Sequence, residues 1–300
     1  MNKLLLVFVA VTLCFSAMPG TAVADPMNKP AKKKVVLIPG FDSHGRGEHE
    51  YTGGFTLLAK TLNESGNIQA IVTEQGWPKD TTVLDDAAVI VMFSDGGTGH
   101  IVIPHMQHID RLMKKGVGLV AIHYAVEIPK GDGGGKYFLD WMGGYFEIHW
   151  SVNPFWNASF ANLPVHPVTR GVQPFTVEDE WYYHMRFRED MKGITPILKV
   201  LPPASSLDRK DGTHEGNPAV RAAVAAGEPQ VMAWTYERPG GGRAFGFTGG
   251  HMHRNWGNDS FRKLVLNAIV WCAHEKVPAK GIESPTPTAA ELEALWKKAP

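Results

Sequence analysis

Short apolar runs alternate with segments of helical periodicity through the first half of the chain. Between the runs, apolar residues recur at the i, i+3, i+4, i+7 spacing of one helix face, as they do from Phe55 to Leu62. Buried strands separated by amphipathic helices are typical of an α/β protein with a parallel sheet. The runs expected to form strands are residues 33–39, 68–73, 87–93 and 118–123.

The pattern changes in the middle of the chain. Residues 137–145 predict a short helix, whereas residues 152–200 predict strands without long helices. Residues 231–236 and 243–248 flank the turn-forming sequence ERPGGG and predict a hairpin. We therefore expect an α/β fold, in which a parallel sheet is flanked by helices and carries an inserted β-rich region.

The two ends of the chain differ from the middle. Lys3 precedes an apolar run, and the small-x-small sequence Ala22-Val23-Ala24 resembles a signal-peptide cleavage site. We expect a signal peptide over residues 1–24, one domain over 33–276 and a Pro-rich peripheral tail over 277–300; a retained N-terminal anchor is the alternative. The mature protein would then be periplasmic or secreted, with no membrane span after cleavage.

A last helical stripe runs from Phe261 to Cys272, with Asn258 or Asp259 as its N-cap. After removal of the signal peptide, Cys272 is the one remaining thiol, so an internal disulfide is excluded. Its place in an apolar stripe favours packing over catalysis.

Charge and motifs exclude several classes of function. The 30 Lys and Arg residues balance the 30 Asp and Glu residues, so the chain lacks the basic field that nucleic-acid binding requires. No G-x-G-x-x-G sequence follows the first predicted strand and no Walker sequence occurs, so no nucleotide cofactor is expected. The 13 His and 9 Trp residues are unusual and direct attention to a metal or sugar site.

Polar residues follow several predicted strands at their carboxyl ends, where ligands of open α/β sheets bind. The residues in these positions are His44 and His49, Asp95, His123 with Tyr124, and His251 with His253. We expect catalytic roles for His123, His44, Asp179 and Glu180. We expect metal-ligating roles for His251, His253, His49 and His149, since His-x-His is a familiar ligand spacing in an extended segment. Nitrogen and carboxylate ligands without thiolates favour zinc, manganese or iron.

Each of these signals has a structural alternative. A histidine in a loop can brace that loop, His123 can be a hydrogen-bonded core residue, and the acidic run at 178–180 can be a solvated strand end. We expect substrate contacts from Trp150, Trp181, Tyr124 and Asp95. A non-catalytic carbohydrate-binding or interaction module is the other functional hypothesis, and ordinary core packing is the alternative for each tryptophan. The stacking platforms of such a module would be Trp150, Trp156, Trp181 and Trp256.

Taken together, the motifs resemble the ThuA-like (trehalose utilisation) family. The matching sequences are SHGRGEHEY, GLVAIHYA, GGYFEIHW, HPVTRGV, VEDEWYYH, GGGRAFGFTGGH and FRKLVLNAIVW. The resemblance implies a class I glutamine-amidotransferase-like (flavodoxin-like) fold and a link to sugar catabolism, and a role on 3-keto-glycosides fits the family's association with sugar dehydrogenases. Amidotransferases carry a nucleophilic Cys at the turn after the fourth strand, but residues 121–125 here read AIHYA. We therefore expect an exported enzyme of hydrolase, lyase or isomerase type that acts on a carbohydrate substrate, with a divalent metal as candidate cofactor and without amidotransferase activity.

Overall fold

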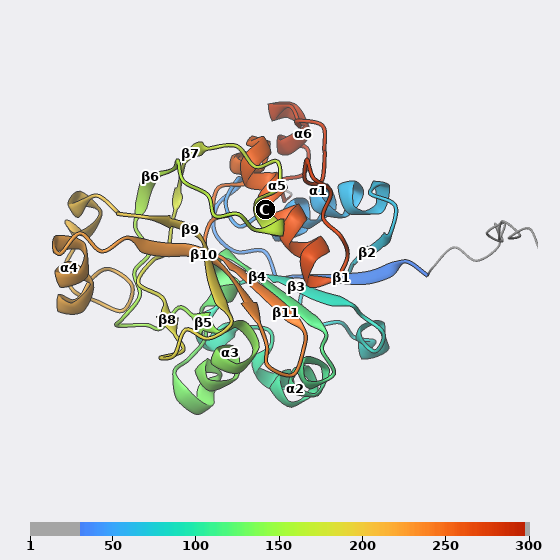
Figure 1. Ribbon diagram of the computed structural model, residues 1–300, viewed down its shortest axis with the longest axis horizontal. Helices are drawn as coiled ribbons and strands as arrows, with labels where there is room; N and C mark the ends of the chain where they lie inside the picture. Colours follow the sequence, from blue (N-terminus) through green and yellow to red (C-terminus); the bar gives the residue numbers. More distant parts are fainter. Residues whose placement is uncertain (1–30, 298–300) are drawn as a thin grey trace, which may run out of the picture. The chain divides into compact units, whose positions relative to one another are not determined.

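A seven-stranded sheet forms the centre of the molecule in the computed structural model, which describes residues 31–297 (Figure 1). The strand order is β2-β1-β3-β4-β11-β10-β9. The strands span Lys33–Pro39 (β1), Ile68–Val72 (β2), Val89–Phe93 (β3), Gly118–Ile122 (β4), Ile194–Val200 (β9), Gln230–Glu237 (β10) and Arg243–Phe247 (β11). Neighbouring strands from β2 to β11 pair in parallel, whereas β10 pairs antiparallel with both β11 and β9.

Helices cover both faces of this sheet (Figure 1). Alternate residues of β1 point to opposite faces, so Val35 and Leu37 join one buried cluster and Val36 and Ile38 the other. The first cluster includes residues of α1 (Tyr51–Glu64) and α5 (Asp259–Cys272), and the second includes residues of α2 (Met106–Lys114) and α3 (Gly135–Met142). Strands that are buried on both faces explain the continuous apolar runs of the sequence.

The inserted region lies between β4 and β10 in the sequence. It contains two small antiparallel sheets, one of β5 (Gly144–Tyr145) and β8 (Arg186–Phe187), the other of β6 (Phe155–Phe160) and β7 (Phe175–Glu180). It also supplies β9 and the short helix α4 (Pro218–Ala225). The prediction of an α/β fold with a β-rich insertion is confirmed.

Three details refine the expectations. The sheet is mixed, since β10, the first strand of the predicted hairpin, runs antiparallel to β11. The helix expected over 137–145 ends at Met142, because Gly143 adopts a left-handed conformation with φ of 75°. The side chain of Asn258 caps α5 by accepting the backbone N–H of Phe261.

The segment expected as a peripheral tail lies against the surface and ends beside the loop after β1. Ile282 and Leu292, the latter in α6 (Ala289–Glu293), are buried. The backbone N–H of Lys297 donates to Glu50 at 2.6 Å, and its ammonium group donates to the carbonyl of Glu48 at 2.9 Å. The predicted signal peptide lies outside the described residues. None of the helices within 31–297 has the length and apolar character needed to span a membrane.

Candidate metal centre

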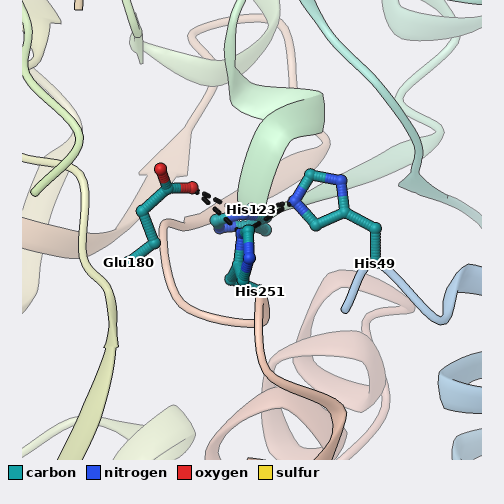
Figure 2. A group of neighbouring side chains, drawn as sticks. All are labelled: His49, His123, Glu180 and His251. Atoms are coloured by element: carbon teal, nitrogen blue, oxygen red, sulfur yellow. Dashed lines mark hydrogen bonds and ion pairs between the residues drawn. The ribbon is translucent and has the colours of Figure 1, made fainter. Parts of the chain in front are cut away.

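Four side chains from four separate segments meet at the carboxyl edge of the sheet (Figure 2). His49 lies in the loop after β1, His123 directly follows β4, His251 lies in the loop after β11, and Glu180 ends β7 of the inserted region. Nε2 of His49 is 3.0 Å from Nδ1 of His251 and 3.1 Å from Nε2 of His123. Oε2 of Glu180 is 3.1 Å from Nδ1 of His251 and 3.5 Å from Nε2 of His123. We call these four residues the His3Glu cluster.

Backbone pairing holds two of these histidines together. The backbone N–H of His49 donates to the carbonyl of His251 at 3.0 Å, and that of His253 donates to the carbonyl of Gly47 at 2.8 Å. Glu48 and Met252 thereby form an antiparallel bridge between the loops after β1 and β11. Because these loops leave parallel strands at the same sheet edge, the fold brings together residues about 200 positions apart in the sequence.

The partners of His123 determine which of its nitrogens carries a proton. Its Nδ1 lies 2.8 Å from the carbonyl oxygen of Thr248, which can only accept, so Nδ1 carries the hydrogen. In the neutral ring, Nε2 is then an unprotonated acceptor. The hydroxyl of Tyr182 lies 3.1 Å from Nε2 and is placed to donate to it.

A similar argument applies to His49. Burial alone would raise the pKa of Asp95, but hydrogen bonds from His49, Tyr51 and Ser43 outweigh the effect of burial and lower this pKa to about 2. The carboxylate of Asp95 therefore accepts hydrogen bonds. The hydroxyl of Tyr51 donates to Asp95 at 2.5 Å and therefore accepts the Nδ1–H of His49 at 2.7 Å. Burial lowers the pKa of His49 to about 3, so its Nε2 is also unprotonated near neutral pH.

When both rings are neutral, the Nε2 lone pairs of His49 and His123 face each other across 3.1 Å. Such an arrangement is repulsive unless a cation lies between the nitrogens. Ligand atoms that are about 2.0–2.1 Å from a tetrahedral zinc lie about 3.3 Å apart, close to the spacings of the His3Glu cluster. The cluster therefore fits a divalent ion with three imidazole ligands and one carboxylate ligand.

Residues behind the cluster hold Glu180 and the loop of His251. The buried carboxylate of Asp179 accepts the backbone N–H groups of Gly250 at 2.7 Å and Met252 at 3.3 Å. The other oxygen of Glu180 accepts from the side-chain amide of Asn153 at 2.9 Å. Outer contacts of this kind orient metal ligands and fix their geometry.

The backbone is strained at the site. His44, His49 and His123 all adopt positive φ values of 63°, 45° and 54°, a conformation that is uncommon for residues other than glycine. His123 does so at the turn between β4 and the 3-10 helix that follows it, the kind of turn that carries the nucleophile in α/β-hydrolases. Cys272 is fully buried in α5, and burial raises the pKa of its thiol. Neither position offers a reactive thiol.

A small polar cavity of about 230 Å³ opens beside the cluster. It is smaller than the roughly 300–1,000 Å³ of pockets for drug-sized ligands, so it suits one small polar molecule or one sugar ring. Its walls include His49 and Glu180, together with residues that the sequence did not single out. The other lining residues are His44, Tyr124, Glu127, Asn153, Tyr182, Arg209, His214 and Glu215.

Several predicted site residues are not members of the His3Glu cluster, although some of them lie beside it. His149 is exposed, and His253 is buried close to Leu292. Asp95 lies behind His49, and the ring of the exposed His44 contacts that of His49 in a tilted arrangement, with 3.7 Å between ring centroids. Tyr124 lines the cavity.

The tryptophans expected as sugar platforms are mostly packed. Trp181 is fully buried against Phe160, Phe247 and Phe261. Trp150 is half-buried, stacks on His184 and is covered by the guanidinium of Arg186. Trp156 and Trp256 are also buried.

The residues that sequence reasoning missed are Tyr51, Tyr182, Glu127 and His214. Tyr51 and Tyr182 lie within two residues of His49 and Glu180, and this proximity was the available signal. Glu127 and His214 are 87 positions apart and carry no local signal of their pairing.

Comparisons with known proteins agree with this architecture. A family model described as trehalose utilisation (ThuA) matches residues 39–272. A ThuA-like protein from Bacteroides uniformis ATCC 8492 is similar at 18% identity with a TM-score of 0.54, covering 83% of this chain and 95% of that chain. A ThuA-like protein from Parabacteroides merdae ATCC 43184 is similar at 15% identity with a TM-score of 0.51, covering 87% of this chain and 99% of that chain. A search of curated proteins finds no match. At these identities, the structural matches show a shared fold.

Proposed function

The chain belongs to the trehalose utilisation (ThuA) family, and from this premise we propose that it is a divalent-metal enzyme of carbohydrate catabolism. The family description connects the chain to trehalose utilisation. The substrate class that we propose is a sugar or a 3-keto-glycoside. The metal would be zinc, manganese or iron, held by His49, His123, His251 and Glu180.

The observation that carries this proposal is the close approach of ligand atoms from four segments: Nε2 of His49 is 3.1 Å from Nε2 of His123 and 3.0 Å from Nδ1 of His251. Oε2 of Glu180 is 3.1 Å from Nδ1 of His251. A divalent ion bound there would polarise a carbonyl or hydroxyl oxygen of the substrate. The roles of His123 and Glu180 in this proposal are those of ligands, in place of the acid–base roles expected from the sequence. Asp179 positions the loop of His251 and does not itself line the cavity.

The chain's own residues would bind and orient the substrate. Four polar residues of the chain line the cavity and can offer hydrogen bonds to a substrate: Tyr124, Tyr182, Asn153 and Arg209. Phe155 is half-exposed and its ring lies 4.9 Å from that of His251, edge to face. A sugar ring entering the cavity would meet hydrogen-bonding groups inside and this aromatic face at the cluster.

The alternative of a carbohydrate-binding module has weaker support. Its proposed platforms Trp156, Trp181 and Trp256 are buried, and Trp150 is covered by His184 and Arg186. A binding module also has no need for three imidazoles and a carboxylate whose ligand atoms all lie within 4.8 Å of one another.

The test is metal content after purification and reloading with zinc, manganese or ferrous iron, measured by elemental analysis and isothermal titration calorimetry. We expect about one ion per chain in the wild type and loss of tight binding in His49→Ala and His251→Ala, since each ligand supplies one of four bonds. His149→Ala is the matched control, because His149 lies outside the cluster and should leave binding unchanged. A wild type that binds none of these ions would refute the metal-enzyme proposal.

We also propose that the protein is exported. The support is the apolar run that follows Lys3 and the Ala22-Val23-Ala24 sequence. The intact mass of the native protein should correspond to an N-terminus near Asp25, and a native protein that retains Met1 would contradict export by cleavage.

A further inference from the structure

A second polar pair borders the cavity beside the His3Glu cluster. Nε2 of His214 lies 3.0 and 3.1 Å from the two carboxylate oxygens of Glu127. Glu127 follows His123 by four residues, and His214 lies in the loop before α4. Both line the same cavity as His49 and Glu180, so a substrate bound at the cluster would lie next to this pair.

The imidazole of His214 is held in a defined orientation. The carboxylate of Glu127 can only accept a proton from Nε2, so in the neutral ring Nδ1 carries the lone pair. The ring stacks on Phe146 at 5.3 Å between centroids, and the backbone carbonyl of His214 accepts from Asn153 at 3.0 Å. Glu127 covers the Nε2 edge of the ring and Phe146 covers one of its faces, and 28% of the side chain is exposed. The hydroxyl of Thr213 is 2.9 Å from Nδ1.

The charged groups around His214 shift its pKa in the opposite direction to that of His49. It faces Glu127, Glu180 and Arg209 across the cavity, and Glu215 accepts its backbone N–H at 3.0 Å. The hydrogen bond to Glu127 raises the pKa of His214 above its ordinary value, although burial opposes this shift. Burial instead lowers the pKa of His49 to about 3. The cavity thus contains one imidazole whose pKa is lowered and another whose pKa is raised.

We propose that His214 is the proton-transfer residue of this site and that Glu127 positions it. The inference rests on the proposed function. In the proposed step, Nδ1 of His214 takes the proton from the carbon next to the substrate carbonyl. The C–H electron pair forms a carbon–carbon double bond while the carbonyl π electrons move onto oxygen, which gives an enolate. Glu127 stabilises the imidazolium that forms, as a carboxylate does in a Ser-His-Asp triad. Return of the proton to the same carbon regenerates the ketone.

This step predicts hydrogen–deuterium exchange. The probe is methyl 3-keto-glucoside in D2O with the metal-loaded full chain, and proton NMR follows the signals of the carbons beside the ketone. The metal content of every sample is measured in parallel. The variants are His214→Gln and Glu127→Gln, with His108→Gln on α2 as a control outside the cavity.

We expect His214→Gln to bind metal normally and to exchange about 10²–10⁴-fold more slowly, the usual contribution of a general base. Glu127→Gln should be slower and should move the acidic limb of the pH profile to lower pH, because loss of the carboxylate lowers the pKa of His214. A residue with only a structural role would not move that limb. His108→Gln should behave as the wild type.

The possible failures are distinguishable. A wild type that binds none of the ions overturns the proposed function and this inference with it. A wild type that binds metal but shows no exchange overturns this inference alone. If the wild type exchanges and His214→Gln exchanges at a rate within tenfold of it, this inference alone is overturned. The same holds if Glu127→Gln leaves the acidic limb of the pH profile where it is in the wild type.

Discussion

Oδ2 of Asp179 accepts the backbone N–H of Gly250 at 2.7 Å, and this bond ties the inserted region to the loop that carries His251. Oδ1 of the same carboxylate accepts the backbone N–H groups of Glu180 at 2.9 Å and Met252 at 3.3 Å. One buried side chain therefore sets the relative position of two members of the His3Glu cluster.

Replacing Asp179 by Ala should weaken metal binding by about 10–100-fold, the usual effect of losing an outer contact of a metal site. It should also lower the free energy of unfolding by about 1–3 kcal/mol, because buried backbone N–H groups lose their acceptor. Calorimetric titration and urea unfolding measure the two effects. Glu178→Ala, an exposed neighbour on the same strand, is the control, and equal metal affinity in the two variants would contradict this role.

Tyr51 supports His49 through its hydroxyl. Tyr51→Phe removes the acceptor of the His49 Nδ1–H and leaves the ring packing of α1 in place. We expect metal affinity to fall by about 10–100-fold with little change in melting temperature. Tyr183→Phe, which loses a hydroxyl bonded to Ser206 away from the cluster, should bind metal as the wild type does. Unchanged affinity in Tyr51→Phe would show that the hydroxyl does not orient His49.

The metal-free protein should lose stability in mild acid. Burial lowers the pKa of His49 to about 3 and the pKa values of His100 and His253 to about 4. Between these values and 6.5, the unfolded chain binds protons that the folded chain does not, so stability falls as the pH falls below about 6.5. Each group contributes up to about 1.4 kcal/mol per pH unit. The raised pKa of His214 acts in a different window, because its stabilising contribution is complete below pH 6.5 and is lost as the pH rises above that value.

Urea unfolding in the presence of a chelator at pH 5 to 8 measures this dependence. We expect stability to decline as the pH falls below 6.5, because the three histidines with lowered pKa values all act in that window. His100→Asn should reduce the slope of the unfolding free energy against pH by about one proton. This variant lacks one of the histidines that bind a proton in the unfolded chain but not in the folded chain. A stability that rises toward pH 5 would contradict the assignment.

Thiol chemistry should be absent from this protein. Cys272 is fully buried, burial raises the pKa of its thiol, and the turn at His123 carries no nucleophile. Iodoacetamide should therefore leave the folded protein unlabelled and its function unchanged, as judged by intact mass and the exchange assay. Glutamine hydrolysis that iodoacetamide abolishes would refute this prediction.

Local patterns in the sequence were sufficient for the architecture. The continuous apolar runs of β1, β3 and β4 reflect strands that are buried on both faces. The apolar stripe of α5 and its Asn258 cap reflect a helix that is buried along most of its length from Phe261 to Cys272. These properties depend on residues within one element, so periodicity reports them. The carboxyl edge of the sheet, and with it the neighbourhood of His49, His123 and His251, follows from the same reasoning.

Membership of the cluster depended on the tertiary structure. The His251-x-His253 spacing points both rings the same way only in an extended segment, but the chain enters a 3-10 helix at His253 and buries that ring elsewhere. Glu180 reaches the cluster because β7 of the inserted region ends there, and Glu127 meets His214 across 87 residues. The sequence by itself determined the layers and the sheet edge, since those follow from short-range patterns of burial. Which side chains meet at that edge was decided by loop conformations and by the docking of the insertion, which no local pattern encodes.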